Sequence, residues 1–248
     1  MKISVITAVY NRVNTVGHAI KSLRSQTYRD VEHVIQDGKS TDGTIRAIEG
    51  FTNPAISLVS DTDTGIYDAI NRGISRSTGD IIGLLHSDDF FAHDRVLEHV
   101  AEAFSDQCID GVYGDLEYVA SNGNMNVVRY WRAGAYDQSR LRYGWMAPHP
   151  TLYLRREVFE RWGLYDTNFR IASDYDAMLR YLVKGHIKLA YIPEVLVKMR
   201  VGGESNRSLG RILLKSREDL QAIRRNGVGG FGTLACKNLS KIPQFFKK

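Results

Sequence analysis

Cysteine, proline and long apolar runs are scarce in this chain of 248 residues. The two cysteines, Cys108 and Cys236, are too few and too far apart for a disulfide framework or a zinc knuckle. No apolar run approaches the roughly 18 residues that a membrane-spanning helix needs. The first residues look like a strand broken by polar side chains, not the apolar core of a signal peptide. These absences favour a reducing, cytoplasmic compartment.

Two nucleotide-binding signatures are also missing. Neither GxGxxG nor GxxxxGK[ST] follows the first expected strand, which disfavours a dinucleotide-dependent enzyme and a P-loop NTPase. What is present is a composition of 43% hydrophobic and 25% charged residues, which is typical of a folded chain with a proper core. The length suits one sizeable α/β domain with an appended tail.

The net charge of +5 is unevenly distributed. Residues 198–248 hold 12 of the 33 Lys and Arg residues but only 3 of the 28 Asp and Glu residues, a local net charge of +9. A neutral-to-acidic body with a basic end indicates an anionic partner at that end. Lipid headgroups are favoured over nucleic acid, because no RNA- or DNA-binding motif accompanies the charge.

Strands and helices alternate along the first 110 residues. The hydrophobic pattern predicts strands at 2–10, 31–36, 56–60 and 81–85, and helices at 16–23, 45–48, 66–74 and 96–104. This alternation predicts a parallel, right-handed, doubly wound sheet. Beyond residue 110, shorter strands at 112–113, 116–119, 126–131 and 152–154 and a helix at 156–162 predict a mixed second half.

Polar side chains follow all four strands of the first half. They are Thr7 to Asn11, Asp37, Asp61 with Asp63, and Asp88 with Asp89. Any one of these groups could be ordinary turn chemistry, but the carboxyl ends of parallel strands meet at one edge of a sheet, where ligands bind. Adjacent carboxylates such as Asp88 and Asp89 repel each other unless a cation, donors or solvent compensate, and Mg²⁺ or Mn²⁺ is the natural cation for them.

Four ordered motifs at these positions resemble the inverting nucleotide-sugar glycosyltransferases of family 2. The motifs are Ser-Val-Ile-Thr-Ala-Val-Tyr-Asn at 4–11, Gln-Asp-Gly-Lys-Ser-Thr-Asp-Gly-Thr at 36–44, the segment 63–73, and His-Ser-Asp-Asp at 86–89. The resemblance implies a GT-A fold, with a Rossmann-like, mostly parallel sheet covered by helices on both faces. It spans about residues 1–205, with a nucleotide-binding half at 1–110 and an acceptor half at 111–205. A basic helical extension would follow at 206–248.

The resemblance also implies a donor site. The residues it would place on the nucleotide are Thr7, Ala8, Val9, Tyr10, Asn11, Asp37, Asp63, Asn71, Ser87 and Asp88. Asp88 and Asp89 would hold Mn²⁺ or Mg²⁺, with donor phosphates and water completing the shell. The chain departs from the family pattern at His86, which stands where the first acid of the DxD motif is expected. Whether His86 contacts the ribose or only packs is open at this point.

An inverting reaction needs a carboxylate that accepts the proton of the acceptor hydroxyl. Asp174 matches the base position of the family's Glu-Asp motif, although Ser173 replaces the usual Glu. The alternative is that acids here only stabilise the first turn of a helix, and Asp176 could do no more than that.

An acceptor wall is expected from a second group of residues, Trp145, His149, Asp176 and Arg200. The segment 145–151 is interpreted as an exposed aromatic-His-Pro loop on which a sugar ring could stack. A structural role for His149 is an equal alternative. Arg200, followed by Gly202 and Gly203, would approach the diphosphate, and a plain turn is the alternative there.

The basic tail has apolar residues at helical spacing from Leu209 to Ile223, then a glycine-rich hinge at 227–232. The last segment combines Phe245 and Phe246 with lysines, which favours attachment to an anionic membrane surface on the inner face of the plasma membrane. The alternative is docking onto the body or onto a second copy in a homodimer.

Together these features predict a metal-dependent inverting glycosyltransferase that moves one sugar from a nucleotide diphosphate sugar. A UDP-linked donor is favoured, and the acceptor would be a lipid-linked glycan in surface polysaccharide or lipopolysaccharide biosynthesis. The Gln-x-x-Arg-Trp signature of processive synthases is absent. One alternative is a sugar nucleotidyltransferase, which would want a glycine-rich triphosphate loop after the first strand. The other is a non-catalytic nucleotide-sugar-binding subunit.

Overall fold

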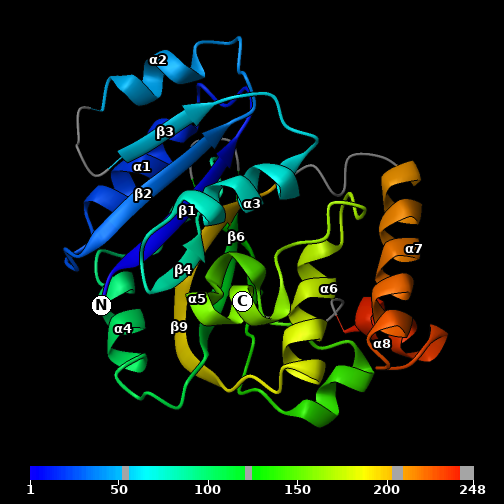
Figure 1. Cartoon of the computed structure of the whole chain (residues 1–248). Coiled ribbons are helices and arrows are strands. Elements are labelled where there is room, and N and C mark those ends of the chain that lie inside the picture. Colours follow the sequence, from blue (N-terminus) through cyan, green and yellow to red (C-terminus); the bar gives the residue numbers. More distant parts are fainter. Residues whose placement is uncertain (52–55, 121–124, 203–208, 241–248) are drawn as a thin grey trace.

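One nine-stranded sheet organises the molecule (Figure 1). The computed structural model describes residues 1–51, 56–120, 125–202 and 209–240. The strands are β1 (Ile3–Val9), β2 (Val31–Asp37), β3 (Ile56–Ser60), β4 (Ile81–Leu84), β5 (Phe90–Phe91), β6 (Gly111–Val119), β7 (Val127–Trp131), β8 (Tyr153–Arg155) and β9 (Leu189–Arg200). The helices are α1 (Val16–Arg24), α2 (Thr44–Glu49), α3 (Ile66–Arg76), α4 (Val96–Ala103), α5 (Arg156–Trp162), α6 (Ser173–Leu179), α7 (Leu209–Arg225) and α8 (Phe231–Leu239). Three short helical turns complete the set: η1 (Gln138–Tyr143), η2 (His149–Thr151) and η3 (Arg180–Lys184).

The first half is the predicted parallel sheet. Strands β3, β2, β1 and β4 lie in that order, and each neighbouring pair is parallel. Side chains of β1 alternate between two faces. Val5 packs with residues of α1 and α4, whereas Ile6 packs with residues of α3. Helices therefore cover both faces, as predicted, and the carboxyl ends of the parallel strands share one edge.

Helix α3 lies very close to β1. A Cβ atom on Gly73 would lie 2.4 Å from Cγ2 of Ile6, so only glycine allows this approach. The helix also differs from the sequence prediction at its start, because Ile66 is exposed and Tyr67 is buried instead. The interior face of α3 therefore begins with the aromatic residue.

The second half of the sheet is mixed. β8 runs antiparallel to β4 and to β6, β9 runs parallel to β6, and β5 and β7 pair antiparallel with β9 and β6. The 12-residue strand β9 was not predicted. It contains Pro193 and the exposed Glu194, and its pairing with β6 shifts register at that point. A proline within an apolar run argues against a strand, but a bulge tolerates it.

The described part of the C-terminal extension docks onto the body. α7 packs beside α6, and α8 packs against α7 and η1 (Figure 1). The predicted glycine hinge is a tight connection, since Val228 is buried and its N–H donates to the Ile223 carbonyl at 3.0 Å. Phe245 and Phe246 lie outside the described residues. Among the helices in the described ranges, none is long and apolar enough to cross a membrane.

Candidate active site

The carboxylate of Asp37 connects the loop that follows β2 to the last residue of β3. Its side chain is fully buried and accepts hydrogen bonds from the Ser40 N–H (3.0 Å), the Ser40 hydroxyl (2.5 Å) and the Ser60 hydroxyl (2.6 Å). Asn11 joins the same loop, because its side-chain oxygen accepts from the Thr41 N–H at 2.9 Å. These hydrogen bonds hold the second predicted motif, residues 36–44, in place at the carboxyl ends of β1, β2 and β3.

Asp63 lies against the loop that follows β2. A Cβ atom on Gly38 would lie 2.7 Å from Oδ2 of Asp63 and 3.4 Å from the ring of Tyr10, so glycine lets these two side chains approach. Burial raises the pKa of Asp63, and the hydrogen bond from the Gly65 N–H at 3.0 Å acts against that rise. The ring of Tyr10 is 59% exposed, so it offers a flat face on which a nucleobase could stack.

Thr7 and Val9 do not line the edge as expected. Both are buried, and the Thr7 hydroxyl donates to the Leu85 carbonyl at 2.7 Å and contacts Nε2 of His33 at 2.9 Å. The side chain of Ala8 is half-buried against the α3 side of the sheet. The first motif thus places Tyr10 and Asn11 at the rim, whereas the strand residues before them lie beneath it.

The stretch His86–Asp89 forms a turn after β4, closed by the Asp89 N–H donating to the His86 carbonyl at 3.0 Å. Ser87 and Asp89 are buried, and Asp88 is half-buried. Oδ1 of Asp89 accepts from the Arg200 N–H at 3.2 Å, but its buried Oδ2 has no hydrogen-bond partner among the described residues. Burial, followed by the neighbouring Asp88, raises the pKa of Asp89 well above its usual range.

This pair of carboxylates fits a divalent cation. A buried carboxylate oxygen without a donor, beside a second and more accessible carboxylate, is a set of hard oxygen ligands of the kind that Mg²⁺ and Mn²⁺ prefer. Arg200 lies next to the pair, where its guanidinium donates to the Asp88 carbonyl and contacts Nδ1 of His18 at 2.6 Å. Arg200 therefore adds positive charge at the place where a diphosphate would lie.

A second group of possible ligands is a poorer candidate. His93, His99 and Glu194 lie close enough to share an ion, with Glu194 Oε2 at 3.5 Å from His93 Nε2 and 2.9 Å from His99 Nδ1. However, Nδ1 of His93 accepts from the Arg95 N–H at 3.2 Å, so a neutral ring carries its proton on Nε2 and offers Glu194 a donor. The contacts are those of a hydrogen-bonded cluster.

His86 is partly buried in the turn that carries Asp88 and Asp89. Burial lowers the pKa of His86, and the charges of Asp88 and Asp174 act against that decrease. Its ring centroid lies 6.2 Å from that of His149. The residue that replaces the first acid of the motif therefore approaches the second half of the molecule at His149.

Asp174 is in the first turn of α6 and is half-buried. The hydroxyl of Tyr67 lies 3.2 Å from Asp174 Oδ1 and 2.6 Å from the Ile171 carbonyl. Tyr67 in turn stacks on Tyr165 with ring centroids 5.9 Å apart. A polar and aromatic path thus connects α3, the segment before α6 and the candidate base.

The segment 145–151 is not the exposed loop that was expected. His149 is buried, its Nε2 lies 2.9 Å from the Tyr165 hydroxyl, and burial lowers its pKa to about 4. Trp145 is half-buried and donates its ring N–H to the Ala133 carbonyl at 3.0 Å. The turn η2 packs against β4 and β6, which is why these side chains face the interior.

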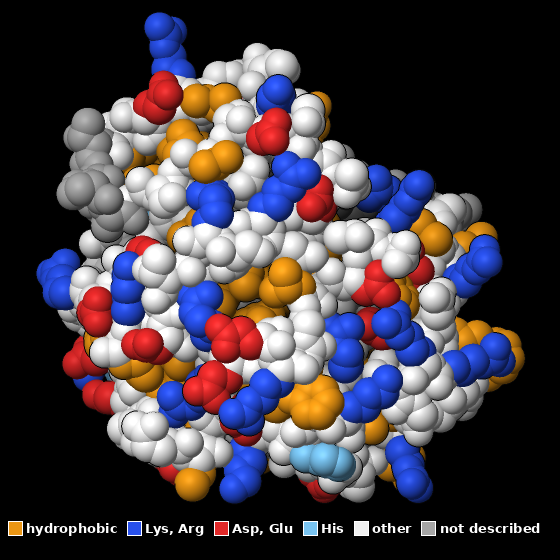
Figure 2. Space-filling model, in the orientation of Figure 1, with side chains coloured by type: hydrophobic (Ala, Val, Ile, Leu, Met, Phe, Trp, Pro, Cys, Tyr) orange, Lys and Arg blue, Asp and Glu red, His pale blue; other side chains and the backbone are white. Residues whose placement is uncertain are grey.

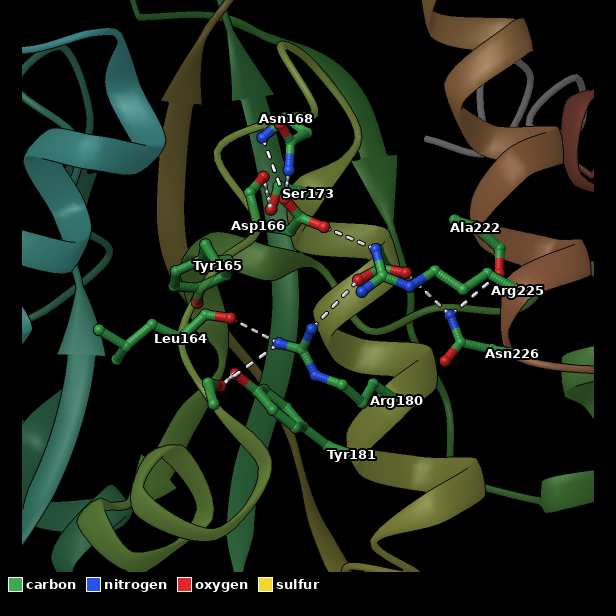
Figure 3. Close-up of polar contacts among 12 residues, drawn as sticks. Leu164, Tyr165, Asp166, Asn168, Ser173, Arg180, Tyr181, Ala222, Arg225 and Asn226 are labelled. Atoms are coloured by element: carbon green, nitrogen blue, oxygen red, sulfur yellow. Dashed lines mark hydrogen bonds and ion pairs between the residues drawn. The ribbon is translucent and has the colours of Figure 1, made fainter.

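Two other predicted site residues, Asp176 and Asn71, form hydrogen bonds within the protein. Asp176 is 1% exposed, pairs with Arg180 at 3.3 Å and accepts from the Asn226 amide at 2.9 Å. Figure 3 shows Arg180 and Asn226 reaching in from opposite sides. The Asn71 amide donates to the Tyr165 carbonyl at 2.8 Å and accepts from the Tyr165 N–H at 3.0 Å. Asn71 therefore joins the two halves of the molecule.

The sequence did not predict a role for three residues near the candidate base. Tyr67 lies inside the motif at 63–73, and its place beside the buried Ala69 and Ile70 was a usable signal. Tyr165, which binds Asn71, and Glu218, which binds the backbone before α6, gave no signal, because their partners lie far away in the chain.

Comparison with known proteins agrees with this geometry. The family model described as "Glycosyl transferase family 2" matches residues 4–168, more than half of the chain. A "PGL/p-HBAD biosynthesis glycosyltransferase" from Mycobacterium bovis is 30% identical over 217 residues, covering 86% of this chain and 82% of the relative. The hyaluronan synthase of Pasteurella multocida is 26% identical over 235 residues, covering 91% of this chain and 23% of the synthase.

Solved structures show the same fold. The mannosyltransferase PcManGT from Pyrobaculum calidifontis, determined with GDP-Man and Mn²⁺, matches with a TM-score of 0.70 at 19% identity, covering 99% of this chain and 73% of that chain. S. aureus TarS matches with a TM-score of 0.66 at 18% identity over 92% of this chain, which spans only 39% of the TarS chain. The chain therefore belongs to glycosyl transferase family 2, and it is a nucleotide-sugar glycosyltransferase with a GT-A fold.

Proposed function

We propose that the chain is a metal-dependent, inverting enzyme that transfers one sugar per encounter from a nucleotide diphosphate sugar to a glycan acceptor. The observation that supports this most is the contact between the two halves at Asp174, where the hydroxyl of Tyr67 from α3 lies 3.2 Å from Asp174 Oδ1. In the proposal Asp88 stands on the diphosphate side and Asp174 on the acceptor side, and ring contacts from His86 to His149 and from His149 to Tyr165 lead from one toward the other. Direct displacement needs this arrangement, with charge neutralised on one side and a proton accepted on the other.

In the proposed reaction, the acceptor hydroxyl attacks C1 of the donor sugar from the face opposite the leaving diphosphate. Asp174 accepts the hydroxyl proton as the new C1–O bond forms, and the old C1–O bond breaks toward the diphosphate. Arg200 stabilises the negative charge of the leaving group. A divalent cation held by Asp88 and Asp89 would supply Lewis-acid stabilisation of the departing charge.

The donor is proposed to carry UDP. Relatives in this fold have been solved with GDP-Man and Mn²⁺ and with UDP-GlcNAc, so the nucleotide differs among them. The exposed ring of Tyr10 provides the stacking surface for the base, and Asp63 and Asn11 stand beside it at the rim. Thermal stabilisation by UDP and by GDP, each with Mn²⁺, distinguishes the two donors.

The acceptor is proposed to be lipid-linked, in surface polysaccharide or lipopolysaccharide assembly. The name of the mycobacterial relative, which indicates glycolipid biosynthesis, supports this class. On α7 and α8, the exposed side chains Leu213, Phe231 and Leu239 lie among Lys and Arg residues, and Figure 2 shows basic and apolar side chains sharing that edge. Such a face suits peripheral attachment to an anionic membrane.

Membrane attachment is tested by sedimentation with vesicles of phosphatidylglycerol and of phosphatidylcholine. We expect binding to the anionic vesicles that weakens with salt and weakens further in a Leu213→Ser/Phe231→Ser variant. Equal recovery with both vesicle types would contradict the proposal.

The base assignment is tested by Asp174→Asn. The amide cannot accept the proton, so we expect transfer to fall by a factor on the order of 10³ while donor binding is retained. Asp94→Asn, an exposed acid before α4, is the matched control and should behave like the wild type. Near-normal turnover in Asp174→Asn would rule out this base. A non-catalytic subunit would bind the nucleotide and show no transfer or donor hydrolysis in any variant.

A further inference from the structure

A buried glutamate of the C-terminal extension binds the backbone directly before the candidate base. Glu218, in the middle of α7, is only 6% exposed. Its carboxylate accepts hydrogen bonds from three consecutive backbone N–H groups, those of Arg170 (2.9 Å), Ile171 (2.8 Å) and Ala172 (2.9 Å). Charge-assisted bonds of this kind are stronger than neutral ones, and three of them fix both the position and the conformation of the segment.

These three residues lead directly to Asp174. The Ala172 carbonyl accepts the Asp176 N–H at 3.0 Å and so begins the first turn of α6. The Ile171 carbonyl accepts from the Tyr67 hydroxyl, the same group that lies 3.2 Å from Asp174 Oδ1. A shift of residues 170–172 would therefore move the base itself and the phenol beside it.

Further contacts from α7 and α8 surround the same turn. Arg225 pairs with Asp166 at 2.6 Å, and Figure 3 shows it extending from α7 across the start of α6. Lys237 of α8 pairs with Asp219 at 2.6 Å and lies 3.1 Å from the ring centroid of Tyr175, next to the base. The Lys237–Asp219 pair is buried, so it costs desolvation and contributes little net stability, whereas the Arg225–Asp166 pair is partly exposed.

We propose that Glu218 is a positioning residue for the acceptor-activating carboxylate. The proposal rests on the proposed role of Asp174. The family model ends at residue 168, so both Asp174 and the helix that carries Glu218, α7, lie beyond the matched region. Glu218 acts through the backbone of residues 170–172 and touches neither donor nor acceptor.

Replacing the carboxylate should lower kcat more than it changes donor affinity. In Glu218→Gln, one of the two oxygens becomes an NH₂ group that faces peptide N–H donors, so the segment loses its defined position. Small misplacements of a reacting group cost roughly 100-fold in rate, and we expect kcat to fall roughly 10- to 100-fold. The donor Kd, measured by calorimetry with UDP and Mn²⁺, should stay within about twofold, because the three hydrogen bonds of Glu218 go to the backbone before α6.

A second readout does not depend on activity. Hydrogen–deuterium exchange of the amides of residues 170–172 should be slow in the wild type and fast in Glu218→Gln, with the exchange of β1 unchanged. Two controls accompany it. Glu157→Gln removes an exposed carboxylate on α5, and Ile223→Val removes one buried methyl group from α7, a group that takes part in no hydrogen bond to residues 170–172. Both leave the three hydrogen bonds of Glu218 intact and should keep kcat close to the wild-type value, although Ile223→Val should lower the Tm.

The outcomes separate the two proposals. Equal kcat in Glu218→Gln and Ile223→Val, or unchanged exchange at 170–172, would overturn the positioning role. If Glu218→Gln does not fold, Tyr67→Phe removes the hydroxyl between Ile171 and Asp174, and wild-type kcat in that variant would overturn the role equally. Turnover retained in Asp174→Asn would remove the base assignment alone, and the exchange experiment would still show whether Glu218 fixes the segment.

Discussion

Asp88 and Asp89 are adjacent in the chain but lie in different environments. Asp88 is half-buried at the edge of the sheet, whereas Asp89 lies beneath it with one oxygen bonded to the Arg200 N–H. In the proposed metal site, the accessible carboxylate of Asp88 would reach a donor phosphate through the cation. Asp89 accepts from the Arg200 N–H, and its remaining buried oxygen would be available to the cation from below.

The metal role of Asp88 is tested by Asp88→Ala. We expect UDP affinity in the presence of Mn²⁺ to fall about 10-fold or more, which corresponds to about 1.4 kcal/mol, because the bridge between protein and diphosphate is lost. Affinity in EDTA should be the same in the variant and the wild type. Calorimetry with and without Mn²⁺ measures both values. An Mn²⁺-dependent gain that survives in Asp88→Ala would show that another residue holds the ion.

Residue types at the site could be predicted from the sequence better than the directions of their side chains. Thr7 was expected to line the donor pocket, and His149 was expected either on an acceptor wall or as a structural histidine; both are buried and bonded to neighbours inside the protein. The role of His86 was left open, and its ring lies near that of His149. A motif fixes the order of residues, but the direction of each side chain depends on strands that pair through distant parts of the chain.

At the scale of elements, the glycine of α3 has a packing role. Its Cα lies against Ile6 of β1, which brings the helix close enough for Tyr67 to reach Asp174.

Strand β9, unlike helix α3, could not be predicted from its sequence pattern. Its Pro193 and Glu194 obscure the periodicity, and only pairing with β6 across a bulge makes it a strand.

Gly73→Ala is expected to destabilise the protein although alanine is the better helix former. Helix propensity favours alanine by about 1 kcal/mol, but a Cβ atom 2.4 Å from Ile6 Cγ2 forces the helix or the strand to move, at a cost of about 1–3 kcal/mol. Urea denaturation measures the difference. Gly232→Ala in α8 is the matched control, because nothing lies within 4 Å of its Cβ position. That variant should be neutral or more stable, and equal effects at both positions would contradict the packing explanation.

For the molecule as a whole, two buried histidines limit stability in acid. Burial lowers the pKa of His33 to about 3 and that of His149 to about 4. The unfolded chain binds a proton at each ring below its ordinary pKa of about 6.5, whereas the folded chain does not. Stability is therefore complete above that pH and falls as the pH decreases toward the folded values, because the unfolded state binds more protons.

Each histidine is expected to contribute a slope of about 1.4 kcal/mol per pH unit in this window. In His33→Gln the amide can still donate to the Thr7 hydroxyl, but it does not titrate. The slope of the unfolding free energy against pH between about pH 6 and pH 4 should then become smaller by the share of one proton, about 1.4 kcal/mol per pH unit. Urea denaturation at several pH values measures this slope. An unchanged slope would show that His33 is protonated in the folded protein.

The sequence by itself determined the parallel first half, the four polar strand ends and the position of Asp174 in a helix's first turn. These features are local, because helical and strand periodicity and the handedness of β-α-β connections operate over short stretches of chain. Only the tertiary structure decided which of these side chains face the site. It brought Asp174 to the hydroxyl of Tyr67, and Glu218 to the backbone before α6. Contacts between residues so distant in the chain follow no period in the sequence, because packing alone decides them.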